Sequence, residues 1–198
     1  MSDQSTYACR KTIPEELSTA ALKALQHYPS LKSKKIVFKY THKASSSIMK
    51  AQPDLTSVLQ IGDDRSYIIY VNRTLTLGGE TLSIEDLPEN VLKGWFGHEL
   101  GHVMDYEGLS KRGLLKFGFG YLFSKEFVRN AENRADRIAI RHGLGNEIIQ
   151  TKNFILNQAG LSEKYKQKIR KLYPSPEQIM EIIQGEKKLA SLSTSHID

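Results

Sequence analysis

The chain has 198 residues, a formal net charge of +6 and a sequence pI of about 9.3. Its 39% hydrophobic and 25% charged residues are ordinary for a globular protein, which excludes a fibrous chain and argues against extensive disorder. The length suits one domain with one core. Because the positive charge is spread along the chain, we expect a solvated surface and no nucleic-acid partner.

Cys9 is the single cysteine, so no disulfide within the chain is expected. No apolar run at the start resembles a signal peptide, and the charge-free stretch 117–124 is far shorter than the roughly 20 residues of a membrane span. We therefore predict a cytoplasmic protein without a transmembrane segment. A secreted or periplasmic protein whose signal had been removed would look the same, and peripheral contact with a membrane stays open.

The first part of the sequence predicts a small α+β lobe over about residues 10–80. Residues 13–27 have the apolar spacing of a helix. The alternating segment 35–40 predicts a strand, and residues 47–51 predict a second strand that ends before Pro53. Residues 66–72 form the strongest strand pattern in the chain, with turn-forming residues on both sides.

The second part predicts a helical lobe over about residues 84–189. A capping box at Ser83 or at Asp86 opens a helix that ends near Gly108, and Ser124 is the expected N-cap of a helix that ends at Gly143. Three more helices are expected, at 146–160, 162–174 and from 175 onward. Residues 1–189 would form one domain, and the serine-rich residues 190–198 a flexible tail.

Two histidines and a glutamate lie within the first of these helices. His98 and His102 are four residues apart, so both imidazoles project from one face and can share one metal ion. Glu99 points to the flank, where it can reach a water on the metal without binding the metal itself. Two nitrogen ligands and a general base predict a zinc hydrolase. The alternative is a chance grouping on a surface helix.

The residues around this motif favour a buried helix. Apolar residues flank it on both sides: Val91, Leu92, Trp95, Phe96, Val103 and Met104. Gly94, Gly97 and Gly101 recur at spacings of three and four, although each costs about 1 kcal/mol relative to alanine inside a helix. We therefore expect another element to approach the backbone of this helix closely.

A hydrolytic zinc site needs a third protein ligand. Glu132, in the helix that follows Ser124, is the best candidate, and Asp136 shares its face. A carboxylate at Asp136 would accept the outward N–H of a ligating histidine and fix its tautomer. The small residues Ala135 and Ala139 would let this helix pack against the glycine face. The alternative is a solvated helix face on which these acids pair with arginines.

His-Glu-Leu-Gly-His at 98–102, followed by Glu-x-x-Ala-Asp at 132–136, resembles the gluzincin group of zinc metallopeptidases. The resemblance covers about residues 84–143. It implies an α+β, zincin-like fold, in which a small N-terminal sheet lobe packs on a helical part with the active-site helix between them. It also implies one zinc ion, Zn(2+), per chain.

In the gluzincin group an edge strand of the sheet pairs with the extended peptide substrate. The resemblance assigns this role to the strand at 67–72, through its residues Tyr67, Ile69, Tyr70 and Asn72. An interior strand without a ligand role is the alternative. The group also carries a residue that stabilises the oxyanion. His142 is one candidate, beside four other residues: Tyr106, Tyr121, Arg129 and Arg141.

The segment 114–123 joins the two site helices and is apolar, aromatic and glycine-bearing. We expect a buried helix of the core. The alternatives are a cleft wall, a mobile lid, or a patch that docks on a membrane or a partner.

Together these patterns predict a zinc-dependent metallopeptidase that acts on a peptide or protein substrate, with Glu99 as general base. Two alternatives remain. One is a latent or narrowly specific regulatory zincin that acts on one partner protein, and the other is a basic binding module with a structural metal site. Glu99 argues against the second, because a structural site closes with four protein ligands and needs no general base. The sequence does not predict the oligomeric state.

Overall fold

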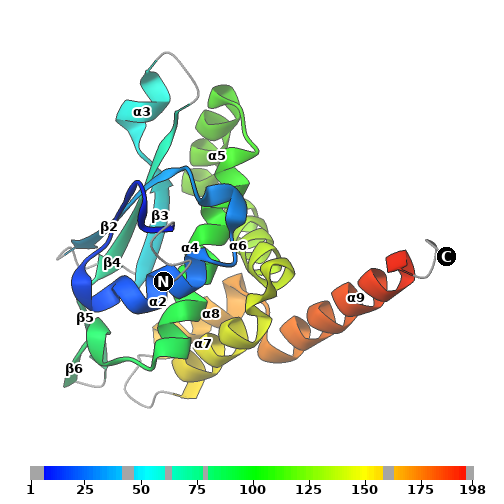
Figure 1. Cartoon of the computed structure of the whole chain (residues 1–198). Coiled ribbons are helices and arrows are strands. Elements are labelled where there is room, and N and C mark those ends of the chain that lie inside the picture. The colour runs from blue at the N-terminus through cyan, green and yellow to red at the C-terminus, as the bar shows by residue number, and fades with distance from the viewer. Residues whose placement is uncertain (1–6, 42–46, 61–63, 78–79, 158–162, 195–198) are drawn as a thin grey trace, which may run out of the picture.

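A computed structural model describes residues 7–41, 47–60, 64–77, 80–157 and 163–194. The chain is a mixed α+β protein in which helices predominate (Figure 1). Its strands all end by residue 83, and its longer helices, except for α2, follow from residue 89 onward. No helix among the described residues is long and apolar enough to cross a membrane.

The main sheet has four strands in the order β1-β2-β4-β3. Its strands are β1 Lys11–Thr12, β2 Lys35–Thr41, β3 Met49–Pro53 and β4 Ser66–Asn72. β2 runs parallel to both β1 and β4, whereas β3 runs antiparallel to β4. A separate hairpin follows, made of β5 Thr74–Leu77 and β6 Glu80–Ser83. The strands expected at 35–40 and 66–72 are confirmed. The strand expected at 47–51 is shifted, because β3 begins at Met49 and includes Pro53, which was expected to end it. β1 and the hairpin were not predicted.

The expected edge position of 67–72 is wrong. β4 pairs with β2 on one side and with β3 on the other, so its backbone has no free edge for a substrate. Tyr67 and Ile69 are fully buried in the core, which removes the basis for the substrate role expected of them and of Tyr70 and Asn72. β3 is the strand at this edge of the sheet.

The α-helices of the N-terminal part are α2 Glu15–Leu25 and the short α3 Leu55–Leu59. The C-terminal part contains α4 Glu89–Glu107, α5 Lys111–Phe123, α6 Lys125–Ala139, α7 Gly145–Asn157, α8 Glu163–Leu172 and α9 Pro176–Thr194. Short 3₁₀ turns form at Pro29–Leu31 and Ile84–Asp86, and a π turn, Ile140–Leu144, joins α6 to α7.

Most predicted helix ends agree with the structure, but two do not. Ser124 caps α6 by accepting a hydrogen bond from the backbone N–H of Phe127, and Gly143 has a positive φ of 82° where the chain turns into α7. Neither predicted capping box opens α4, which begins directly after Pro88. The expected tail is also partly wrong, because α9 continues to Thr194; residues 195–198 lie outside the described part.

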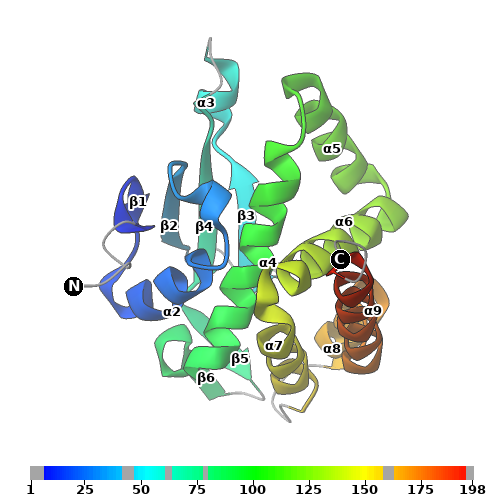
Figure 2. The same cartoon turned by 45° about the vertical axis from the view of Figure 1, so that its right-hand side comes forward.

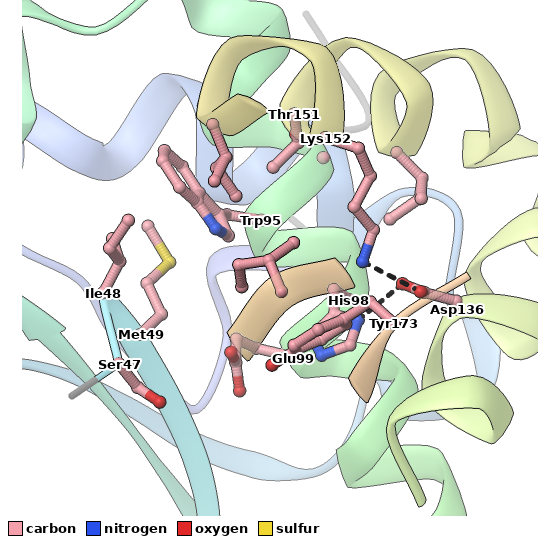
Figure 3. A pocket seen from close by; sticks show the side chains of 14 residues that line it. Ser47, Ile48, Met49, Trp95, His98, Glu99, Asp136, Thr151, Lys152 and Tyr173 are labelled. Atoms are coloured by element: carbon pink, nitrogen blue, oxygen red, sulfur yellow. Dashed lines mark hydrogen bonds and ion pairs between the residues drawn. The ribbon is translucent and has the colours of Figure 1, made fainter. Parts of the chain in front are cut away.

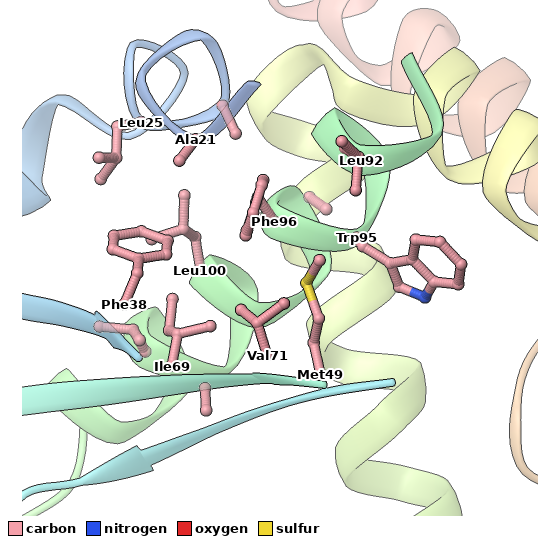
Figure 4. Close-up of a cluster of buried hydrophobic side chains, with 14 of the residues drawn as sticks. Ala21, Leu25, Phe38, Met49, Ile69, Val71, Leu92, Trp95, Phe96 and Leu100 are labelled. Carbon is pink, nitrogen blue, oxygen red and sulfur yellow. The ribbon is translucent and has the colours of Figure 1, made fainter. Parts of the chain in front are cut away.

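α4 is the central helix. Figure 2 shows it between the sheet and α2 on one side and α6 and α7 on the other. In Figure 4 its residues Phe96 and Leu100 lie between the sheet and α2, and their neighbours are Ala21, Leu25, Phe38, Ile69 and Val71. The phenyl rings of Phe38 and Phe96 meet edge to face with 5.5 Å between their centroids. The histidine motif therefore lies on a helix that is packed from several directions.

The glycine side of α4 confirms the expected close approach. A Cβ atom on Gly101 would lie 2.5 Å from the carbonyl oxygen of Ala135 on α6, and one on Gly94 would lie 2.4 Å from that of Glu147 on α7. Only glycine permits these contacts between backbones. The close contact at Gly101 brings α6 against the turn of α4 that carries the two histidines.

The segment 114–123 is not the buried core helix that was expected. In α5 only Leu114 and Phe117 are buried, and the large apolar residues Leu115, Phe119, Leu122 and Phe123 are exposed. A 13-residue helix that connects two packed helices can bury one stripe against them, but nothing among the described residues covers its second apolar stripe. This segment instead forms one wall of a cleft.

Candidate metal centre

Three buried side chains from α4 and α6 converge on one point. His98 Nε2 lies 3.0 Å, and His102 Nε2 3.4 Å, from Oε2 of Glu132. One ligand atom from each residue can be chosen so that all three lie within 4.8 Å of one another. This is the group expected from the sequence, and it could hold a metal ion. Two imidazoles and a carboxylate suit zinc, among other divalent transition metals.

Asp136 fixes the orientation of the first histidine. The Nδ1–H of His98 donates to Oδ1 of Asp136 over 2.7 Å, which leaves Nε2 facing Glu132. Asp136 has no exposed surface, and its other oxygen forms an ion pair of 3.0 Å with the ammonium group of Lys152 on α7 (Figure 3). The predicted role of Asp136 as the partner of a ligating histidine agrees with this geometry.

Lys152 and Tyr173 complete the surroundings of His98 and were not predicted. The ammonium group of Lys152 lies 3.9 Å from the centre of the Tyr173 ring, and that ring lies 5.5 Å from the His98 ring (Figure 3). A signal for Lys152 was present in the sequence. It shares the apolar stripe of α7 with Ile148 and Ile155, and a lysine in such a stripe needs a buried partner.

Glu99 is buried beside the ligands and outside the ligand group. Its Oε2 accepts a hydrogen bond of 2.6 Å from the backbone N–H of Ala51 on β3. The hydroxyl of Tyr106 donates to the carbonyl oxygen of the same Ala51 over 3.3 Å. Burial raises the pKa of Glu99 above its usual range. Glu99 is thus a carboxylate with an enhanced affinity for protons, placed between the ligands and the edge strand.

The histidines and the carboxylates shift one another's pKa values in opposite directions. Burial disfavours the charged form of His98, but Asp136 and Glu132 outweigh it and raise the pKa of His98 from 6.5 to about 10. Burial also favours neutral Glu132, but His102 and His98 outweigh it and hold its pKa well below its usual range. Without a metal, a proton on His98 therefore takes the place of a cation beside these acids.

The buried carboxylates around the histidines carry an excess of negative charge that favours a bound cation. Metal ligation requires neutral histidines, and three buried carboxylates surround them: Glu99, Glu132 and Asp136. Lys152 forms an ion pair with Asp136, and the half-buried Lys168 attracts Glu132, so the buried carboxylates still outnumber the lysines that interact with them. Buried charges of this kind are stable only when paired or bound to a metal. In addition, the Nδ1 atom of buried His102 has no hydrogen-bond partner among the described residues.

Tyr121, one of the oxyanion candidates, reaches the ligand group. Its hydroxyl donates to Oε1 of Glu132 over 2.8 Å, so it positions the ligand. His142 does not reach it. Its Nδ1–H donates to the carbonyl oxygen of Ile138, and its ring stacks on Tyr28 with 4.5 Å between centroids. The π turn after α6 directs the His142 side chain toward Tyr28, so His142 does not line the cleft over the ligand group.

A cleft opens onto the ligand group from the side of β3 and α5. It has a volume of about 370 Å³ and reaches Glu99, His102 and Glu132 at its base. Its walls are mostly apolar and come from β3 and α3 on one side and from α5 on the other: Ala51, Pro53, Leu55, Val58, Leu114, Leu115, Phe117 and Leu122. A molecule in this cleft would lie beside both the ligands and the buried base.

Comparison with models of protein families, with curated proteins and with solved structures finds no match for this chain.

Proposed function

We propose that the chain is a zinc-dependent metallopeptidase of the gluzincin type. The observation that carries the proposal is the convergence of His98, His102 and Glu132 at the base of a cleft, with Glu99 beside them. The sequence resemblance, the small sheet lobe beside the central helix α4, and the hydrogen bond from His98 to Asp136 support the same assignment.

His98, His102 and Glu132 would hold the ion, and the excess of buried negative charge would offset its charge. A zinc ion there would supply Lewis acidity, which lowers the pKa of a water to about 7 and polarises a carbonyl group. Glu99 would accept the proton of the attacking water and later deliver it to the leaving amine, which its raised pKa favours. β3, the edge strand that lines the cleft, would lie beside the extended substrate.

A structural metal site, the less favoured alternative, fits these residues poorly. Structural zinc sites close with four protein ligands, and only three converge here among the residues that the structure describes. The cleft also reaches two of these ligands and the buried base directly. This open arrangement supports a catalytic site over a structural one.

The decisive experiment compares Glu99→Gln with the wild type and with Glu126→Gln, a change at an exposed glutamate of α6. We expect about one zinc per chain in all three proteins, measured by elemental analysis. Hydrolysis of a peptide library by the zinc-loaded protein should fall at least about a hundredfold in Glu99→Gln alone, because the general base is lost. Loss of zinc is expected instead for His98→Ala. A wild-type chain without zinc, or full activity in Glu99→Gln, would refute the proposal.

A further inference from the structure

Large exposed apolar side chains gather on the two helices that flank the cleft, α3 and α5. Seven such side chains are exposed in the described part of the chain, and six of them belong to α3 and α5. We call these six the apolar rim: Leu55, Leu59, Leu115, Phe119, Leu122 and Phe123. Between 66% and 85% of each is exposed. Both helices lie at the same end of the molecule in two views (Figures 1 and 2). So dense an apolar surface on a folded protein marks an interaction site.

The apolar rim extends beyond the cleft. Leu55, Leu115 and Leu122 line it, but Leu59, Phe119 and Phe123 do not. A substrate inside the cleft would therefore leave half of the rim in water. An extended surface that covers the whole end of the molecule would bury all six side chains at once.

The charge on the α5 side of the rim indicates which kind of surface would bind there. Residues 108–125 contain no acidic residue and four basic ones, Lys111, Arg112, Lys116 and Lys125. Three of these are exposed, and Lys111 donates from its ammonium group to the carbonyl oxygen of Gln60 over 2.5 Å, which ties α5 to the end of α3. Basic residues beside exposed leucine and phenylalanine are typical of helices that lie in the interface of an anionic membrane.

We propose that the apolar rim docks on an anionic lipid surface and places the mouth of the cleft against the membrane. The 13 residues of α5 span about 20 Å, which is too short to cross a bilayer but sufficient to lie along its interface. Phe119 and Phe123 enter the acyl boundary, and Arg112 and Lys116 meet lipid phosphates. This docking goes beyond the metallopeptidase proposal and does not depend on a bound metal.

Vesicle sedimentation tests the docking directly. The probes are vesicles of phosphatidylcholine alone and of phosphatidylcholine with about one third phosphatidylserine. We expect binding to the anionic vesicles, with and without zinc, and at least about tenfold weaker partitioning to neutral vesicles or at high salt. The partition coefficient on anionic vesicles should fall about tenfold or more in the double variant Phe119→Ser with Phe123→Ser. In Lys116→Glu the partition coefficient should fall severalfold on anionic vesicles and stay unchanged on neutral vesicles.

Two surface changes elsewhere serve as matched controls. Met180→Ser alters the seventh exposed apolar side chain, on α9, and Lys171→Glu reverses an exposed charge on α8; neither should change partitioning. Phe119→Trp supplies a direct readout, since its emission should shift to shorter wavelength when anionic vesicles are added. No preference for anionic vesicles, or equal losses in the controls, would overturn the proposal. Binding of an unfolded apolar polypeptide to the rim, without binding to lipid, would also overturn the proposal. The rim would then be part of the substrate-binding surface.

Discussion

The two sides of α4 differ in packing, in polarity and in exposure. The side toward α6 and α7 is closed, because Gly101 and Gly94 let neighbouring helix backbones come into contact, and a buried ion pair between Asp136 and Lys152 lies behind His98. The side toward β3 and α5 is open. There Glu99 and His102 meet a cleft whose outer walls expose apolar side chains.

This difference assigns to opposite sides of α4 two requirements of the proposed hydrolytic site. Ligands must be held in place before the ion arrives, which favours dense packing and hydrogen bonds that orient the ligands. The reacting group must enter and leave, which requires a surface that nothing in the fold covers. Changes on the closed side should therefore affect folding and metal affinity together, whereas changes on the open side should leave folding intact.

The largest effect is expected from Asp136→Asn on the closed side. The change leaves Lys152 buried without a counter-charge, which should destabilise the fold by about 3–5 kcal/mol. It also removes the carboxylate that orients His98, so zinc affinity should fall about 10- to 100-fold. Urea unfolding followed by circular dichroism measures the first effect, and zinc titration against a chelator measures the second.

Two further variants separate the effect of the unpaired Lys152 charge from the effect of losing the Asp136 carboxylate that orients His98. Adding Lys152→Met to Asp136→Asn should recover much of the stability but none of the zinc affinity. Asp105→Asn breaks an ion pair with the more exposed Arg134 and should cost no more than about 1 kcal/mol. If Asp136→Asn and Asp105→Asn unfold at the same urea concentration, the closed side does not depend on its buried charges.

A somewhat smaller effect is expected from Gly101→Ala. The new methyl group would lie 2.5 Å from the carbonyl oxygen of Ala135, so α6 must move away from α4 at a cost of about 1–3 kcal/mol. Since α6 carries Glu132, zinc affinity should weaken as well. Gly118→Ala on α5 is the matched control, because no atom lies within 4 Å of its added Cβ. It should stabilise the protein by about 0.5–1 kcal/mol, and an equal loss in both variants would contradict the packing argument.

The closed side could be predicted from the sequence because each part of it leaves a local pattern. Each local pattern identifies the residues on one face of a helix. The patterns are the histidines four residues apart, the glycines at helical spacing, and the carboxylate pair on a second helix. The histidine and glycine faces of the first helix and the carboxylate face of the second can pack together in few other arrangements. The structure accordingly brings His98, His102 and Glu132 together and places Ala135 against Gly101.

The open side could not be predicted in the same way, because it depends on the order of the strands. Strand pattern does not say which strand lies at the edge, so β4 was given a position that belongs to β3. One signal was available. Pro53 lies in β3, and proline is largely confined to edge strands because it lacks an N–H group. The exposure of α5 could not be predicted from its own sequence, since its apolar residues resemble those of a core helix.

Zinc affinity should rise with pH, by about 1.4 kcal/mol for each pH unit. Asp136 and Glu132 raise the pKa of His98 to about 10 in the metal-free protein, so His98 carries a proton at neutral pH that zinc must displace. Below the raised pKa, each unit of added acidity should weaken binding about tenfold. Chelator competition at several pH values between about 6 and 8 measures this slope. An affinity independent of pH would show that His98 is already neutral.

The smallest effect on stability is expected on the open side, from Leu122→Ser. This side chain is 77% exposed, so its replacement should change the free energy of unfolding by less than about 0.5 kcal/mol. Leu114→Ser is the control on the same helix; Leu114 is buried, and the change should cost at least about 2 kcal/mol. Because Leu122 lines the cleft, its loss should still weaken hydrolysis of apolar peptides severalfold through KM. If the two variants destabilise the protein equally, Leu122 is covered in solution, and α5 belongs to the closed side.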